Sequence, residues 1–179
     1  MEKLQTFNKD QIKIVNESVE IAEELVSNHY KMSASQWLHR RYDVKTLADL
    51  NPDEVVHGPY AQIIRYKGQR KDTSLESSTY DFYKICLQDY TILATLEQLS
   101  EMRLFSFTLY IIIHELIHIV RFSKFLQSFD ASPEEKLAEE ARVHKKTHEI
   151  LKTVRFSGLA DVLKFYNKWR IPFDSLQNS

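Results

Sequence analysis

The sequence predicts an α+β fold that is mostly helical, with a small β-sheet packed on two consecutive helices. Apolar residues recur at helical spacing through most of the 179-residue chain, whereas two short segments near its middle are rich in aromatic and β-branched residues. The length and an apolar fraction of 43% are sufficient for one hydrophobic core. We therefore expect a single domain that spans residues 1–179.

The first part of the chain, residues 1–58, is expected to be helical. Asn8 is a suitable N-cap, Gln11 occupies the capping-box position three residues later, and apolar residues then recur at helical spacing. These signals predict a helix over about 9–30. Two shorter helical pieces are expected at about 36–41 and 44–50.

The part that follows, residues 59–102, is expected to contain the strands and a linking helix. Aromatic and β-branched residues predict strands at 61–66 and 80–87. The polar segment 67–78 between them contains a glycine and three serines, which is typical of a long mobile loop. The helical pattern resumes at about 89–100.

Residues 103–153 are expected to form two helices. The second has the clearest start signal in the chain, because Ser132 is a favourable N-cap, Pro133 suits the first helical position and Glu135 completes a capping box. The predicted helices are about 103–123, about 133–153, and a shorter one at about 159–169 within the terminal part 154–179.

One pentapeptide in the first of these two helices, His114-Glu115-Leu116-Ile117-His118, has the form H-E-x-x-H. Successive helical residues turn by about 100° and rise about 1.5 Å, so His114 and His118 project from nearly the same face, about one turn apart. Two imidazoles in this arrangement can bind one zinc ion. Glu115, rotated to the side, can accept a proton from water without occupying the metal.

A third ligand must come from another part of the chain, because a catalytic zinc ion usually has three protein ligands and one water. The connection 122–132 is short enough for the next helix to fold back against the first. Glu140 lies two turns into that well-capped helix, which is a rigid position for a ligand. The spacing alone leaves several candidates open: Glu139, Glu140, His144 and His148.

The two motifs together resemble the gluzincin branch of the zincin metallopeptidases, of which thermolysin is the familiar member. They are H-E-x-x-H at 114–118 and, about twenty residues later, E-A-R-V-H at 140–144. The resemblance covers roughly residues 104–150 and implies a zincin-like fold that hydrolyses peptide bonds. It implies that His114, His118 and Glu140 bind Zn²⁺ and that Glu115 is the catalytic general base.

The chain departs from the gluzincin pattern at one position. Where that family usually has an aspartate, four residues after the glutamate ligand, this chain has His144. A neutral imidazole can accept a hydrogen bond from a metal-bound histidine, but it orients that histidine less strongly than a carboxylate does. His144 is therefore expected either beside the ligands or as an alternative third ligand in place of Glu140.

Peptide hydrolysis also needs a donor that stabilises the oxyanion. The predicted strand at 80–87 is expected to serve as an edge that pairs with an extended peptide. The candidate oxyanion or substrate contacts are His148, Arg142, Tyr60 and Tyr83.

Two other functions fit parts of the same pattern. A non-catalytic descendant would keep the zinc ligands and bind a peptide or protein without cutting it. A di-iron carboxylate bundle would use Glu115 and His118 as one Glu-x-x-His unit, but neither His144 nor His148 has a glutamate three residues before it. The predicted strands also argue against a pure bundle.

Charge and composition exclude several classes of partner. Lys plus Arg numbers 24 against 25 for Asp plus Glu, so no net field attracts nucleic acid or an anionic membrane. Only three glycines occur, without a G-x-G-x-x-G or Walker sequence. The longest apolar stretch, 104–113, is far shorter than the ~20 residues that span a bilayer. A peptide or protein substrate remains as the expected partner, and no pattern specifies an oligomeric state.

The expected location is a reducing cytoplasm. Cys86 is the lone cysteine, which excludes an internal disulfide. The first ten residues, MEKLQTFNKD, lack the apolar stretch of a secretory signal.

Overall fold

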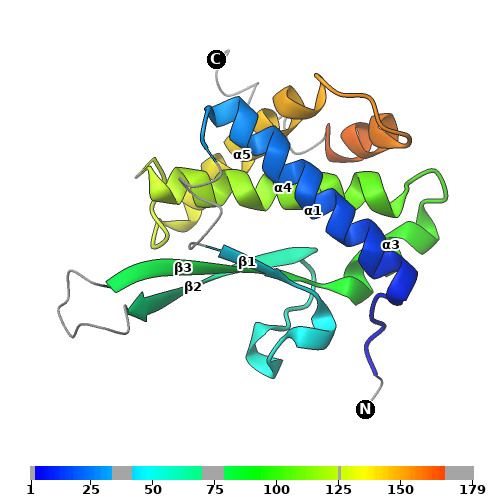
Figure 1. The fold of residues 1–179 in the computed structure, drawn as a ribbon, viewed down its shortest axis with the longest axis horizontal. Helices are drawn as coiled ribbons and strands as arrows, with labels where there is room; N and C mark the ends of the chain where they lie inside the picture. Colours follow the sequence, from blue (N-terminus) through cyan, green and yellow to red (C-terminus); the bar gives the residue numbers. More distant parts are fainter. Residues whose placement is uncertain (1–2, 34–41, 70–78, 125, 168–179) are drawn as a thin grey trace.

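The fold has two layers, a three-stranded sheet and a set of helices that lies on one side of it (Figure 1). The computed structural model describes residues 3–33, 42–69, 79–124 and 126–167. Within these ranges the predicted fold class, α+β and mostly helical, is confirmed.

Helix α1 spans Lys9–Tyr30, as predicted. The Asn8 side chain accepts a hydrogen bond from the Gln11 backbone N–H, and the Gln11 side chain accepts one from the Asn8 N–H, both at 2.9 Å. This capping box satisfies two amide groups that the first helical turn leaves unpaired. The helix ends at Lys31, which adopts the left-handed conformation with φ of 54°.

The sheet contains β1 (Tyr42–Lys45), β2 (Ala61–Gln69) and β3 (Thr79–Leu87), in the order β1-β3-β2. β1 runs parallel to β3, and β2 runs antiparallel to it. Both predicted strands are present, and β2 extends three residues into the segment that was expected to be a loop. The rest of that segment, 70–78, lies outside the described residues.

The short helical piece predicted at 44–50 is only partly helical. Val44, predicted to lie in a helical piece at 44–50, belongs to β1, and only Leu47–Asp49 forms a turn of 3₁₀ helix. Val44 pairs with Ile85 of β3 and packs against the core, so tertiary pairing outweighs local propensity here. The piece predicted at 36–41 lies outside the described residues.

β3 is the central strand, so the prediction that it forms a free edge is wrong where β1 pairs with it. β1 contacts β3 over Tyr83–Cys86, and β2 pairs with β3 along its whole length. In the part of the chain that the structure describes, β1 and β2 are the outer strands. A peptide that extends the sheet by hydrogen bonding would therefore add to β1, to β2, or to the part of β3 before Tyr83 that β1 does not cover.

Three helices follow the sheet, α3 (Asp89–Gln98), α4 (Leu104–Ser123) and α5 (Pro133–Leu151). Residues 159–167 are also helical. These elements agree with the predicted helices to within two residues wherever the chain is described. α5 begins at the predicted capping box, in which Ser132 and Glu135 bond to each other's backbone N–H groups.

Helix α4 forms the centre of the fold, and α1 crosses it (Figure 1). Every residue from Ser106 to Arg121 is buried except Glu115. By length and composition α4 could cross a membrane, but 83% of its most apolar window is buried inside the fold, as in the core helix of a globular domain. A helix whose surface is apolar on nearly every side must be buried by other elements of the fold, because exposing that surface to water is unfavourable.

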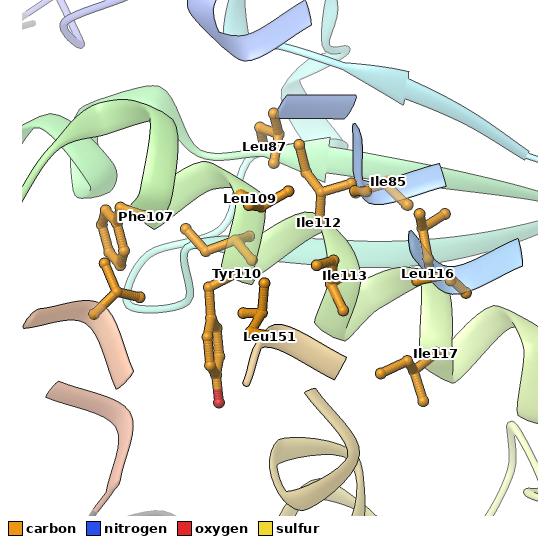
Figure 2. Close-up of a cluster of buried hydrophobic side chains, with 14 of the residues drawn as sticks. Ile85, Leu87, Phe107, Leu109, Tyr110, Ile112, Ile113, Leu116, Ile117 and Leu151 are labelled. Carbon is orange, nitrogen blue, oxygen red and sulfur yellow. The ribbon is translucent and has the colours of Figure 1, made fainter. Parts of the chain in front are cut away.

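Two faces of α4 contact different layers. In Figure 2, Ile112 lies beside Ile85 of β3, whereas Tyr110 points away from the sheet. Each fully buried leucine or isoleucine contributes about 1.5–3 kcal/mol relative to an exposed one. Together with the packing of α1 on α4, this burial fixes the rotation of α4 about its axis, and the face with Tyr110 lies toward α5.

A buried ion pair lies on the opposite face of the sheet. Lys84 alternates with Tyr83 and Ile85, which face the helices, and its Nζ donates to Glu54 Oε1 at 2.8 Å. Glu54 also accepts hydrogen bonds from the Asn51 N–H and the Tyr66 hydroxyl. Lys84, Asn51 and then Tyr66 lower the pKa of Glu54 from 4.5 to about 2, although burial opposes the shift. This pair anchors the 3₁₀ turn Pro52–Glu54 to the sheet.

We expect acid to weaken the fold through Glu54. Because its pKa is lower in the folded state, its contribution to stability is complete above pH 4.5 and is lost as the pH falls toward 2. Urea unfolding should show that the stability difference between the wild type and Glu54→Gln shrinks over this range. Lys84→Met, which removes the partner, should show the same convergence. Stability curves that stay parallel would contradict this assignment.

Candidate metal centre

α4 and α5 pack antiparallel, with one stripe of side chains on each helix facing the other. On α4 this stripe follows the four-residue spacing of Tyr110, His114 and His118. The Tyr110 hydroxyl lies 3.3 Å from His148 Nδ1 near the end of α5, whereas His114 Nε2 lies 3.0 Å from Glu140 Oε2, two turns earlier. The H-E-x-x-H motif is thus placed opposite the first half of α5.

Three of the predicted residues converge at this interface. Glu140 lies 3.0 Å from His114 Nε2 through one oxygen and 3.0 Å from His118 Nε2 through the other, and the two Nε2 atoms are 3.2 Å apart. Ligands of a tetrahedral zinc ion lie about 2.0–2.2 Å from the metal, hence about 3.3–3.6 Å from one another. The triad could therefore hold a metal ion, and its two imidazoles and one carboxylate are a donor set that zinc uses.

The charges of the triad make metal binding dependent on pH. Burial raises the pKa of the Glu140 carboxyl, but His114 and His118 beside it outweigh this effect and hold the pKa below its usual range. Burial lowers the pKa of His118, but Glu140 raises it above its ordinary value. Both imidazoles are buried, while the Glu140 side chain is 48% exposed. A metal ion would compete with protons for these atoms, so binding should weaken in acid.

The two histidines of the triad differ in the hydrogen bonding of their Nδ1 atoms. His118 Nδ1 lies 3.0 Å from Gln127 Oε1, a contact that orients the ring and leaves Nε2 directed at Glu140. His114 Nδ1, in contrast, is buried and has no hydrogen-bond partner among the described residues. Gln127, which is not part of the triad, therefore orients the ring of His118.

Glu115 is the exception in the buried stretch of α4. It is partly exposed, whereas every other residue from 106 to 121 is buried. Burial nevertheless raises the pKa of its carboxyl, with His114 and His118 opposing the shift. A carboxyl whose pKa is raised, in a position that water can reach, is suited to accept a proton.

A pocket of about 320 Å³ lies next to His118. Gln127 and Phe122 line it, and both contact His118, through the hydrogen bond above and through rings 6.2 Å apart. The stacked rings of Tyr83 and Phe122, 5.7 Å apart, form part of its wall, and Arg65 of β2 lies at another side. The pocket thus lies between two residues that contact His118 and the outer strand β2.

His144 lies beside the triad without joining it. Its Nε2 is 3.8 Å from Glu140 Oε2, beyond hydrogen-bond distance, and its ring packs 4.2 Å from that of His114. Its Nδ1 lies 2.7 Å from the Tyr110 hydroxyl. Burial, together with the nearby His114, lowers the pKa of His144 to about 2, so the ring is neutral. The geometry therefore groups Glu140 with the two histidines as a candidate ligand and puts His144 next to it.

Two of the candidate oxyanion contacts have other partners. The ring nitrogens of His148 lie 2.9 Å from the His144 carbonyl oxygen and 3.1 Å from that of Leu163, which ties α5 to the last described helix. Arg142 forms an ion pair with Glu139. Both residues therefore support the packing of α5.

The two tyrosine candidates lie in different surroundings. Tyr60 packs edge-on against Phe107, and its hydroxyl accepts a hydrogen bond from Thr95 at 3.1 Å. Tyr83 borders the pocket next to His118. Of the two, Tyr83 is the one whose surroundings include a contact of the triad.

A buried ion pair connects α4 and α5 directly beside the triad. Glu139 accepts two hydrogen bonds from the Arg121 guanidinium, at 2.8 and 2.9 Å. Both side chains are only 9% exposed. Because Arg121 lies three residues after His118 and Glu139 directly precedes Glu140, this pair fixes the register in which the two helices present their ligands.

No protein-family model, curated protein or solved structure matches the chain. The similarity to gluzincins therefore consists of the two sequence motifs and of the triad that the fold builds from them. What the geometry shows is a candidate metal site at His114, His118 and Glu140.

Two contacts of the site could not be recognised from the sequence. Tyr110 precedes His114 by four residues on the same helical face, but a tyrosine in an apolar run is most often a core residue. Gln127 lies in the irregular connection between α4 and α5, where no periodic pattern assigns it a direction. Only the spacing of Tyr110 was a usable signal.

Proposed function

We propose that this protein is a zinc-dependent metallopeptidase of the gluzincin type. The observation that carries the proposal is the convergence of His114, His118 and Glu140 on two packed helices, with Glu115 inside the same motif. These three residues would hold the ion and leave one position to water. Zinc bound there would polarise the scissile carbonyl and lower the pKa of water toward ~7.

Glu115 supplies the general base in this proposal. It takes the proton of the attacking water and passes it to the leaving amine. Its partial exposure admits water, and the raised pKa of its carboxyl increases its affinity for that proton. His118, oriented by Gln127, and the half-exposed Glu140 would provide the ligands beside His114.

We place the peptide or protein substrate along β2. This strand is an outer strand in the described part of the sheet, and its Arg65 lines the pocket that also contains Gln127. An extended peptide that pairs with β2 gains main-chain hydrogen bonds regardless of its sequence, and a side chain can enter the pocket. A reducing cytoplasm remains the proposed setting, from the lone Cys86.

Metal content and peptide cleavage together test the proposal. The zinc-loaded protein should contain one zinc ion per chain by mass spectrometry and should cleave a mixed peptide library. Removal of zinc with a chelator should abolish cleavage, and added zinc should restore it. His118→Ala should lose both properties, whereas His29→Ala, a change of an exposed histidine on α1, should keep both.

The same measurements separate the alternatives. Stoichiometric zinc with an intact peptide library would identify a zinc-stabilised binding module and overturn the peptidase. Two iron ions per chain would favour a di-iron carboxylate site. A protein that takes up no metal would overturn the metal centre itself.

A further inference from the structure

The pocket next to His118 lies between the sheet and the connection from α4 to α5. The sheet contributes Arg65 of β2 and Tyr83 of β3 to its lining, and the connection contributes residues 126–129. Its volume of about 320 Å³ is at the lower end of the range of ligand pockets, ~300–1,000 Å³. The pocket therefore suits one side chain of a peptide rather than a larger molecule.

Aromatic rings form much of the pocket wall. Tyr83 and Phe122 stack 5.7 Å apart, with an angle of 12° between their planes. Phe129 lies 5.3 Å from Phe122 at an angle of 55°, and the Arg65 guanidinium lies 4.6 Å from the centre of the Phe129 ring. A ring that packs against other rings gains more than its buried area alone provides. This wall therefore favours an aromatic occupant over an aliphatic one.

The charges of the lining do not favour an ionised occupant. Arg65 and Asp81, which have opposite charges, both line the pocket, and Asp130 lies 3.6 Å from Arg65. A substrate lysine or arginine would meet Arg65, and a substrate carboxylate would meet the two aspartates. Leu126, in contrast, is 56% exposed and adds an apolar surface to the same lining. An uncharged side chain thus fits the pocket better than a charged one.

Arg65 places the pocket beside the strand along which we put the substrate. Arg65 and Tyr83 are partners across β2 and β3, and both line the pocket, so they lie on the same face of the sheet. Alternate side chains of a peptide that pairs with β2 would project from this face. Because neighbouring strands lie about 4.8 Å apart, the peptide side chain next to Arg65 comes within reach of the pocket.

We propose that this pocket selects peptides by one aromatic side chain and that Phe129 is the specificity-determining residue. The occupant packs against the ring of Phe129, which the Arg65 guanidinium contacts from β2. This inference rests on the proposed function, because it takes the substrate to be an extended peptide. It adds a preference for aromatic over aliphatic side chains.

Matched peptides test the proposal. The probes are labelled, end-blocked hexapeptides of alanine with phenylalanine, leucine, alanine, glutamate or lysine at one central position. For the zinc-loaded protein, kcat/KM for the phenylalanine peptide should exceed that for the leucine peptide about 2- to 10-fold, which is the typical gain from one aromatic pair. It should exceed that for the alanine peptide at least about 10-fold. The peptide Kd values, measured by fluorescence anisotropy with Glu115→Gln, should follow the same order.

Variants of Phe129 show whether its ring causes the preference. Phe129→Ala should reduce the preference for phenylalanine over alanine about 10-fold. Phe129→Leu keeps an apolar side chain and should abolish the preference for phenylalanine over leucine. Phe82→Ala, on the opposite face of β3, should keep both preferences. Thermal unfolding checks that each variant folds, and Phe129→Leu provides the test if Phe129→Ala does not.

The possible results separate the pocket from the peptidase. Equal kcat/KM for the phenylalanine and leucine peptides, a preference that survives in Phe129→Leu, or a preference for a charged peptide would overturn the pocket and leave the peptidase intact. Intact peptides with Kd values that still favour phenylalanine and depend on Phe129 would overturn the peptidase alone. A protein that neither binds nor cleaves any of the peptides would overturn both.

Discussion

Replacement of Glu115 by glutamine is expected to remove most peptide cleavage and to leave the zinc content unchanged. Glutamine has the same shape but cannot act as a base, and the loss of a general base typically costs about 10²- to 10⁴-fold in rate. His114 and His118 should stay in place, because both are buried and contact Glu140. The measurements are kcat on a fluorogenic peptide and zinc per chain.

The same variant should be no less stable than the wild type. Burial raises the pKa of Glu115, which means that at neutral pH its ionised form is less favourable in the folded than in the unfolded chain. Glutamine carries no charge and removes that cost. The Tm of zinc-free Glu115→Gln should therefore equal or exceed that of the wild type.

A matched control for this experiment is Glu101→Gln, at an exposed carboxylate just before α4. It should change neither kcat nor zinc content. Undiminished cleavage by Glu115→Gln would exclude Glu115 as the base. Loss of zinc from that variant would instead give Glu115 a part in metal binding.

Replacement of Glu139 by glutamine is expected to have the largest effect on stability. It leaves the Arg121 guanidinium buried without a counter-charge, and breaking such a pair typically costs about 3–5 kcal/mol. For a chain of this length that corresponds to a decrease in Tm on the order of 10 °C. Because the pair fixes the register of α4 and α5, zinc affinity should fall too.

Two further variants sharpen this test. Glu134→Gln, an exposed carboxylate on the first turn of α5, should cost less than about 1 kcal/mol. The double variant Arg121→Met and Glu139→Leu replaces the pair by apolar side chains and should recover much of the lost stability. A wild-type Tm for Glu139→Gln would show that the pair contributes little.

The elements with strong local signals could be predicted from the sequence. α1 and α5 begin at capping boxes, whose residues interact within four positions of one another. β1 could not be predicted, because its four residues gain their stability from pairing with β3, a contact between distant parts of the chain. The central position of β3 was missed for the same reason: without β1 it would be an outer strand.

The two candidate histidine ligands were predictable because a regular helix fixes their directions, whereas the gluzincin-like motif selected Glu140 among several candidates on the next helix. His114 and His118 are one turn apart, and Glu140 lies on a helix with a defined start. Arg142 shows the limit of such reasoning, since it was one of four candidate oxyanion or substrate contacts and the structure pairs it with Glu139 on the same helix. The ion-pair partner of a side chain as long as that of arginine depends on the final packing.

The unequal exposure of the three ligands has a consequence for how the site would exchange its metal. His114 and His118 belong to the most deeply buried helix, whereas the Glu140 side chain is 48% exposed. A rotation of one side chain at the surface would open the site and leave the core untouched. Loading and release would then depend on the rotamer of Glu140, so a chain that has already folded could still acquire its ion.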